Sequence, residues 1–150
     1  VRTIAKGIRK ISSKRAGHLE IFTNARFTLY EGKGLDYITE ASAIHQYEPF
    51  RTNLNKASFA YYVCELADYL LPEKQEHPEI YERICESLSA LCNAEDETER
   101  HGEVYKFALD LLWHLGFLPR SQSVSASSIH EYIESITERR LKTLKLLELS

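Results

Sequence analysis

The hydrophobic period changes once along the chain, near Pro49, and this change most restricts the fold. Residues 18–30 alternate apolar and polar side chains, residues 35–46 continue this period of two, and Gly32 and Gly34 between them suit a tight turn. After Pro49, apolar residues recur about every 3.6 positions, which is typical of amphipathic helices. The sequence therefore predicts a hairpin followed by helices.

Four helices are expected in the second part of the chain. Pro72 and Gly116 stop two of them, Pro78 opens another, and Ser128 and Glu131 have the spacing of a capping box. The expected helices cover residues 52–71, 78–92, 99–115 and 128–148.

Residues 2–9 have the composition of a short basic strand that pairs beside the hairpin, and residues 10–17 have that of a loop. The predicted fold class is α+β: a partial antiparallel OB-type β-barrel of about three strands over residues 1–48, followed by an all-α helical domain over residues 49–150. The chain has no Met and starts directly in the strand-like run at Val1, so we expect further sequence upstream.

The charge distribution indicates a polyanion partner for the first part of the chain. The first fifteen residues carry six basic side chains and no acidic one, although the whole chain has a net charge of −3. OB-type barrels bind single strands with cations and aromatic stacking platforms, and Phe22 and Tyr30 are the stacking candidates. The candidate DNA-binding residues are Arg2, Lys6, Arg9, Lys10, Lys14, Arg15, Arg26 and Lys33.

The helical part offers two alternatives to DNA binding. In the first, the chain is a protein-interaction adaptor, with a partner-peptide groove near Arg100, Lys106 and Trp113 on the aromatic third helix. In the second, it is a hydrolase that uses Glu65 or Asp68, although no catalytic motif accompanies this pair.

Metal, cofactor and membrane functions find no support in the sequence. Cys85 and Cys92 are seven positions apart without a C-x-x-C pattern, so no metal site is expected, and no cofactor motif occurs. No apolar run approaches the roughly 18 residues that cross a bilayer, so we expect a cytoplasmic protein.

Three stretches resemble the RecO family of bacterial recombination mediators and DNA-repair proteins. The string IAKGIRKISSKRAGHLEIFTNARFTLYEGKGLDYITEA resembles the basic loop and hairpin of the family's N-terminal OB domain. The run from Phe50 to Pro119, with EL-x-D-x-L-LPE at Glu65–Glu73 and LGF-LP at its end, is similar to the family's helical domain. LKTLKLLE at Leu141–Glu148 is similar to its C-terminal helix.

The resemblance implies a function and a set of partners. It implies binding of single- and double-stranded DNA through Lys6, Arg9, Lys10, Lys14 and Arg15. It also implies strand annealing, and recombinase loading together with RecR and with the C-terminal tail of single-strand-binding protein. The expected location is the bacterial cytoplasm, in association with the nucleoid.

Two departures from the family pattern change these expectations. The family's OB domain has two more strands before the segment that matches Val1, so the barrel is expected to be truncated. Many members also carry a Cys-based zinc module after the LG-x-x-P element, where this chain has only residues 120–128. Zinc is therefore not expected here.

Overall fold

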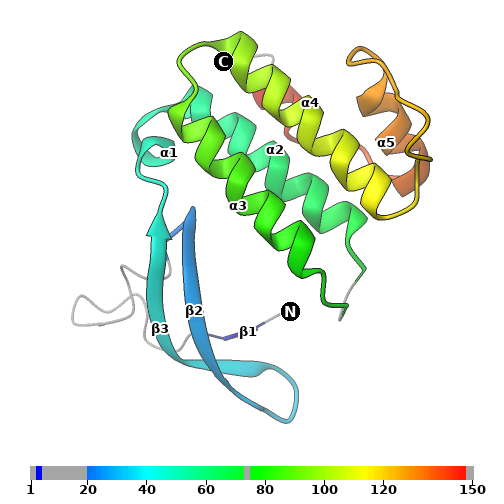
Figure 1. Cartoon of the computed structure of the whole chain (residues 1–150). Helices are drawn as coiled ribbons and strands as arrows, with labels where there is room; N and C mark the ends of the chain where they lie inside the picture. Colours follow the sequence, from blue (N-terminus) through cyan, green and yellow to red (C-terminus); the bar gives the residue numbers. More distant parts are fainter. Residues whose placement is uncertain (1–2, 5–19, 73–74, 148–150) are drawn as a thin grey trace. The chain divides into compact units, whose positions relative to one another are not determined.

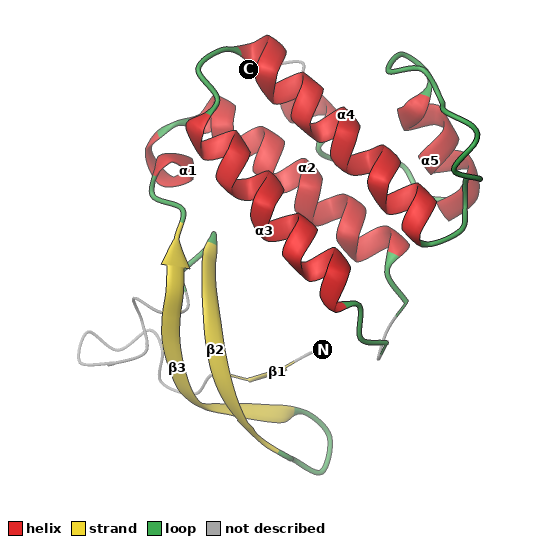
Figure 2. Cartoon of the chain, viewed as in Figure 1, coloured by secondary structure: helices red, strands yellow, loops and turns green. Residues whose placement is uncertain are grey.

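The structure is a computed structural model that describes residues 3–4, 20–72 and 75–147. The chain divides into two compact units, residues 1–48 and residues 49–150. The described strands all belong to the first unit and the described helices to the second (Figure 2). Among the described residues, no helix combines the length and the apolar character that a membrane span requires.

The first unit is a small mixed sheet. Strands β2 (Thr23–Tyr30) and β3 (Asp36–Gln46) form an antiparallel hairpin (Figure 1), and β1 (Thr3–Ile4) pairs with β3 in parallel, giving the order β1-β3-β2. A parallel neighbour requires a connection of a dozen or more residues, and residues 5–22 have that length. The α+β class with a partial OB-type sheet is confirmed, but β1 is not antiparallel as expected.

Strand β2 begins later than the alternation predicts. The expected strand starts near residue 18, whereas residues 21–22 form a turn and β2 starts at Thr23. Phe22 has a φ of 55°, a left-handed conformation that an extended strand does not contain. The expected basic loop over residues 10–17 lies outside the described residues.

A β-bulge decides which side chains share a face of the hairpin. The register passes from Thr28 opposite Glu40 to Leu29 opposite Ile38, so that Thr39 is the extra residue. Alternation alone predicts Ile38 and Ala41 on opposite faces. The bulge instead returns both to one apolar face, and this face consists of Ala25, Phe27, Leu29, Ile38, Ala41 and Ala43.

Glycine is required at one position of the hairpin turn. A Cβ atom on Gly32 would lie 2.2 Å from the carbonyl oxygen of Leu35. The backbone N–H of Gly32 donates to the Asp36 carboxylate at 3.3 Å. The sequence prediction of a tight turn after Tyr30 agrees with this geometry.

The second unit is built around three long helices that run alternately up and down and pack against one another in pairs (Figure 1). Its core consists of fully buried side chains from all three, including Phe59, Leu66, Leu91, Phe107 and Leu112. The described helices are α1 (Pro49–Thr52), α2 (Leu54–Leu70), α3 (Pro78–Asn93), α4 (Glu97–His114), α5 (Ile129–Thr137) and α6 (Leu144–Leu147).

Local signals explain most of the helix ends. The side chains of Asn53 and Asp96 accept hydrogen bonds from backbone N–H groups in the first turns of α2 and α4. Helix α2 ends just before Pro72, as predicted. After α4, Gly116 takes a φ of 77° and the N–H of Phe117 donates to Leu112 O at 3.0 Å, which is a Schellman motif.

The C-terminus of α3 is capped by cations from its two neighbours. The last turn of α3 contains no basic residue. Instead, Lys56 of α2 donates its Nζ to Cys92 O at 2.5 Å, and the buried Arg100 of α4 donates its Nη1 to Ala94 O at 3.3 Å. Both positive charges lie where the helix dipole favours them.

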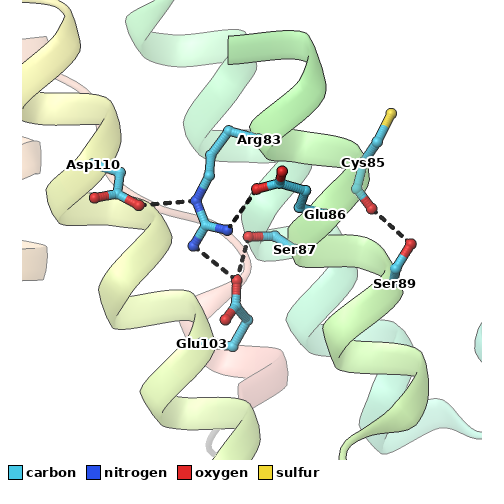
Figure 3. A network of polar contacts seen from close by, with 7 residues as sticks. All are labelled: Arg83, Cys85, Glu86, Ser87, Ser89, Glu103 and Asp110. Atoms are coloured by element: carbon cyan, nitrogen blue, oxygen red, sulfur yellow. Dashed lines mark hydrogen bonds and ion pairs between the residues drawn. The ribbon is translucent and has the colours of Figure 1, made fainter. Parts of the chain in front are cut away.

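One arginine of α3 contacts three carboxylates, two of which belong to α4 (Figure 3). Arg83 donates its Nε to Asp110 at 2.8 Å, its Nη2 to Glu103 at 3.0 Å and its Nη1 to Glu86 at 3.3 Å. Ser87 donates to the same oxygen of Glu103 at 2.6 Å. The Glu103 and Asp110 side chains are 15% and 23% exposed, whereas Glu86 is 69% exposed. The two contacts to α4 are therefore the shielded ones.

The last predicted helix is wrong in length. Helix α5 ends at Thr137 because Glu138 takes a left-handed φ of 53°, and α6 resumes only at Leu144. The predicted capping box is also wrong, because the Ser128 side chain makes no capping hydrogen bond and instead accepts from Ser125 Oγ at 3.1 Å.

Candidate nucleic-acid interface

The face of the hairpin opposite the apolar one carries a cation and an exposed aromatic ring. Arg26, Thr28 and Tyr30 occupy every second position of β2 and are all exposed, so their side chains share this face. Tyr30 is 67% exposed and lies opposite Tyr37 on β3. The Thr28 hydroxyl donates a hydrogen bond at 3.1 Å to the carboxylate of Glu40, the residue opposite it on β3.

This arrangement has the chemistry of a single-strand binding surface. An exposed ring can stack on any base, and a guanidinium on the same face of the strand can bind a backbone phosphate. Lys33 is exposed in the hairpin turn that follows Tyr30. Three of the predicted residues, Arg26, Tyr30 and Lys33, therefore belong to one hairpin.

Phe22 does not join this group. It lies in the turn before β2, eight positions from Tyr30, and a strand of that length extends over roughly 25 Å. The residue is half-buried and takes part in a further interaction. A single base cannot contact both rings.

Most of the predicted DNA-binding residues lie outside the described residues. These are Arg2, Lys6, Arg9, Lys10, Lys14 and Arg15.

On α4, the structure separates the three candidates for a peptide groove. Lys106 and Trp113 are two helical turns apart and share a face, with Lys106 exposed and Trp113 half-buried. Arg100 lies elsewhere: it is 9% exposed, and its guanidinium stands 5.8 Å from the centroid of the Phe59 ring. Together with its bond to Ala94 O, this places Arg100 in the bundle interior.

The connection after α4 lies along the face that carries Trp113. Trp113 donates its indole N–H to Gln122 O at 3.0 Å, and Tyr105 donates its hydroxyl to Val124 O at 2.9 Å. Residues 119–128 bury no side chain fully, whereas Leu118 and Ile129 at their two ends are buried. Backbone carbonyl groups of this connection therefore accept the hydrogen bonds of the Tyr105 and Trp113 side chains, which a bound peptide would otherwise use.

Glu65, the acid proposed for a hydrolase, is a structural acceptor. Its carboxylate receives the backbone N–H groups of Lys142 and Thr143 at 2.9 and 3.0 Å and the Thr143 hydroxyl at 2.5 Å. Partial burial raises the pKa of Glu65, but hydrogen bonds from Thr143, the two backbone N–H groups and Tyr69 outweigh it, so the pKa is lower than usual. Such a carboxylate stays ionised and occupied, which does not suit a general acid.

Among the described residues, no group of three or more His, Cys, Asp and Glu side chains is arranged so that it could hold a metal ion. Cys64, Cys85 and Cys92 form no disulfide bond.

The sheet and the bundle define an α+β protein that joins part of an OB-type barrel to a helical domain. Family comparisons identify it further. The model of the recombination protein O N-terminal domain matches residues 1–47, and that of the C-terminal domain matches residues 51–146. The chain therefore belongs to the recombination protein O (RecO) family.

Three relatives illustrate the similarity, and each is named DNA repair protein RecO. The relative from Roseiflexus sp. is 34% identical over 125 residues, which cover 83% of this chain and 43% of the relative. Relatives from Dehalococcoides mccartyi and Symbiobacterium thermophilum are 33% and 30% identical over 119 residues, 79% of this chain and 46% of each relative. The chain thus spans less than half the length of these relatives.

No solved structure matches the chain significantly. The family models and relatives indicate no catalytic family.

Two groups of charged residues were not predicted from the sequence. In the Arg83 cluster only the i, i+3 pair of Arg83 and Glu86 is local, because Glu103 and Asp110 come from another helix. By contrast, Arg139, Arg140, Lys142 and Lys145 fall within seven residues, a density that the sequence does display.

Proposed function

We propose that this chain acts in DNA repair as a DNA-binding recombination mediator without enzymatic activity. Residues 1–48 would form its nucleic-acid-binding domain and residues 49–150 its helical domain. The observation that carries the proposal is the shared, exposed face of Arg26 and Tyr30 in a family of proteins named for DNA repair.

The net charges of the two units support this assignment of DNA binding to the first unit. Residues 1–48 contain eight basic and five acidic residues, a net charge of +3, whereas residues 49–150 contain eleven basic and seventeen acidic residues, a net charge of −6. A polyanion is attracted to the first unit and repelled by most of the second.

We extend the proposal to the finer activities that the resemblance implies. These are binding of single- and double-stranded DNA, annealing of complementary strands, and recombinase loading together with RecR and single-strand-binding protein. Lys106, which is exposed on α4, is the proposed contact for the acidic-hydrophobic tail of single-strand-binding protein, whereas the Tyr105 and Trp113 side chains near it already bind the connection after α4. Family membership supports these roles, and titration of a tail peptide against the full chain tests the last one.

The DNA-binding experiment separates phosphate contacts from base stacking. Fluorescence anisotropy measures the affinity of the full chain for a labelled single-stranded oligonucleotide at several salt concentrations. Each lost phosphate contact reduces the slope of log K against log salt by about 0.7. We expect this reduction for Arg26→Gln, and one of about 3 when Arg9, Lys10, Lys14 and Arg15 are all changed to Ala.

Tyr30→Ala provides the complementary result. Loss of one base stack costs about 1–3 kcal/mol and leaves the number of phosphate contacts unchanged, so we expect weaker binding with the same salt slope. Arg120→Gln removes an exposed cation from the helical unit and serves as the charge-matched control. Salt-independent binding that survives the Arg9, Lys10, Lys14 and Arg15 changes would overturn the proposal.

A further inference from the structure

The segment Arg139–Lys145, which we call the C-terminal basic segment, differs in charge from the rest of the helical unit. It contains Arg139, Arg140, Lys142 and Lys145 and no acidic residue. Residues 49–138 and 146–150 contain seven basic and seventeen acidic residues. More than a third of the unit's positive charge therefore lies in seven consecutive residues.

The fold directs these four cations outward. Exposed and buried positions alternate from residue 140 to residue 143: Arg140 and Lys142 are exposed, whereas Leu141 and Thr143 are 5% and 8% exposed. Arg139 before this stretch and Lys145 in α6 are exposed as well. Alternation of this kind places successive side chains on opposite sides of an extended backbone. The inward side anchors the segment, and the outward side presents the charges.

The acidic residues beneath the segment bind its backbone and not its cationic side chains. Glu134 accepts the N–H of Leu141 at 2.7 Å, and Glu65 accepts the N–H groups of Lys142 and Thr143. Within the described part of the chain, none of the four cations forms an ion pair. The exposed side chains of Arg140, Lys142 and Lys145 can therefore contact an external anion.

Tyr69 of α2 fixes the start of the segment. The Arg139 guanidinium lies 5.2 Å from the centroid of the Tyr69 ring, and the Tyr69 hydroxyl donates to Arg140 O at 3.4 Å. With the contacts of Glu65 and Glu134, four consecutive residues are held in place. The cations thus stand on an ordered backbone, which lowers the entropic cost of forming several contacts at once.

We propose that the C-terminal basic segment is a second phosphate-binding surface, which contacts the sugar-phosphate backbone of DNA. The inference rests on the proposed DNA binding and adds a contact that does not involve the sheet. Arg and Lys bind phosphates whatever the bases are, so this contact is independent of sequence.

Acidic neighbours make the contact a short-range one. Glu138 and Asp68 are exposed nearby, and Glu65 and Glu134 lie beneath the segment, so its field does not extend far into solvent. A DNA strand that binds both surfaces at once gains affinity from multivalency. The segment therefore strengthens an existing complex and can hold a second strand during annealing.

A DNA backbone fits this surface better than a membrane does. An interfacial membrane segment requires a broad apolar face, and Leu146 is the single strongly exposed apolar residue in 139–147. Anionic vesicles nevertheless present the same phosphate chemistry, so they form one arm of the test.

The test compares two triple variants of the full chain that carry the same change in charge. One changes Arg140, Lys142 and Lys145 to Gln and keeps Arg139 on Tyr69. The other changes the exposed Arg51, Lys106 and Arg120 to Gln. Anisotropy with labelled oligonucleotides should show a salt slope reduced by about 2 in the first variant and a much smaller change in the second. Thermal melts followed by circular dichroism should give the same midpoint for both.

Lysine protection provides a readout on the unmodified chain. Bound DNA should slow acetylation of Lys142 and Lys145 relative to Lys106. Equal slopes for the two triple variants, or no protection of these lysines, would overturn the inference while leaving the proposed function intact. Loss of binding to phosphatidylserine vesicles without an effect on DNA would also overturn it. A chain that binds no DNA at all would refute the proposed function itself.

Discussion

The Arg83 cluster allows a quantitative prediction, because one guanidinium holds carboxylates of very different exposure. Arg83→Met removes the charge between Glu103 and Asp110 and leaves two shielded carboxylates close together. Breaking a fully buried ion pair costs about 3–5 kcal/mol. Because these side chains retain 15% and 23% exposure, we expect a loss of about 2–3 kcal/mol in the free energy of unfolding.

Two further variants remove weaker contacts of the same cluster. Glu86→Gln removes the contact of a carboxylate that is 69% exposed and should cost less than about 0.5 kcal/mol. Ser87→Ala removes one hydrogen bond to Glu103, which keeps its bond to Arg83, and should cost about 1 kcal/mol.

Urea unfolding monitored by the fluorescence of Trp113, the single tryptophan, measures these changes in the helical unit. Changing both Arg83 and Glu103 to Met should recover part of the stability lost in Arg83→Met, because one uncompensated carboxylate is then absent. Equal losses in Glu86→Gln and Arg83→Met would refute the reasoning, since exposure would then not govern the energy of these contacts.

Three other predictions concern the ends of helices. The lowered pKa of Glu65 means that its contribution to stability is complete above the carboxyl group's ordinary pKa and is lost as pH falls through the lowered one. The protection factors of the Lys142 and Thr143 amides, which compare their exchange rates with those of an unfolded chain at the same pH, should fall below that point, and Glu65→Gln should remove this pH dependence. Gly116→Ala should lower stability by about 1 kcal/mol in a thermal melt, because φ is 77° and no atom crowds the site. Glu138→Gly should raise the melting temperature slightly, as glycine relieves a left-handed φ of 53° at an exposed residue, and an unchanged or lower value would contradict this account.

Periodicity predicts the elements of this chain well, because each depends on nearby residues. The change of period near Pro49 separates strands from helices, and Pro72, Pro78 and Gly116 mark helix ends that the structure contains. The break at Glu138 has no such signal, since glutamate favours a helix. It precedes residues 141–143, whose backbone N–H groups are bound by the carboxylates of Glu134 and, from α2, of Glu65.

At the candidate nucleic-acid interface and on α4, periodicity again predicts only what depends on nearby residues. Alternation along β2 places Arg26 and Tyr30 together, because both lie on one strand. It cannot detect the extra residue Thr39, which arises from pairing between strands. Nor does it distinguish Arg100 from Lys106: both are cations on α4, but one caps a neighbouring helix in the interior and the other is exposed.

The capping of α3 by Lys56 and Arg100 has a consequence for the folding of the helical unit. A helix that carries its own cap can form and fray independently, whereas the last carbonyl groups of α3 acquire their cationic partners only after α2 and α4 are both in place. Formation of the final turn of α3 is thus thermodynamically coupled to the docking of two other helices. The three helices should consequently open as one cooperative unit. The last turn of α3 should then be protected from opening for as long as the whole bundle stays folded.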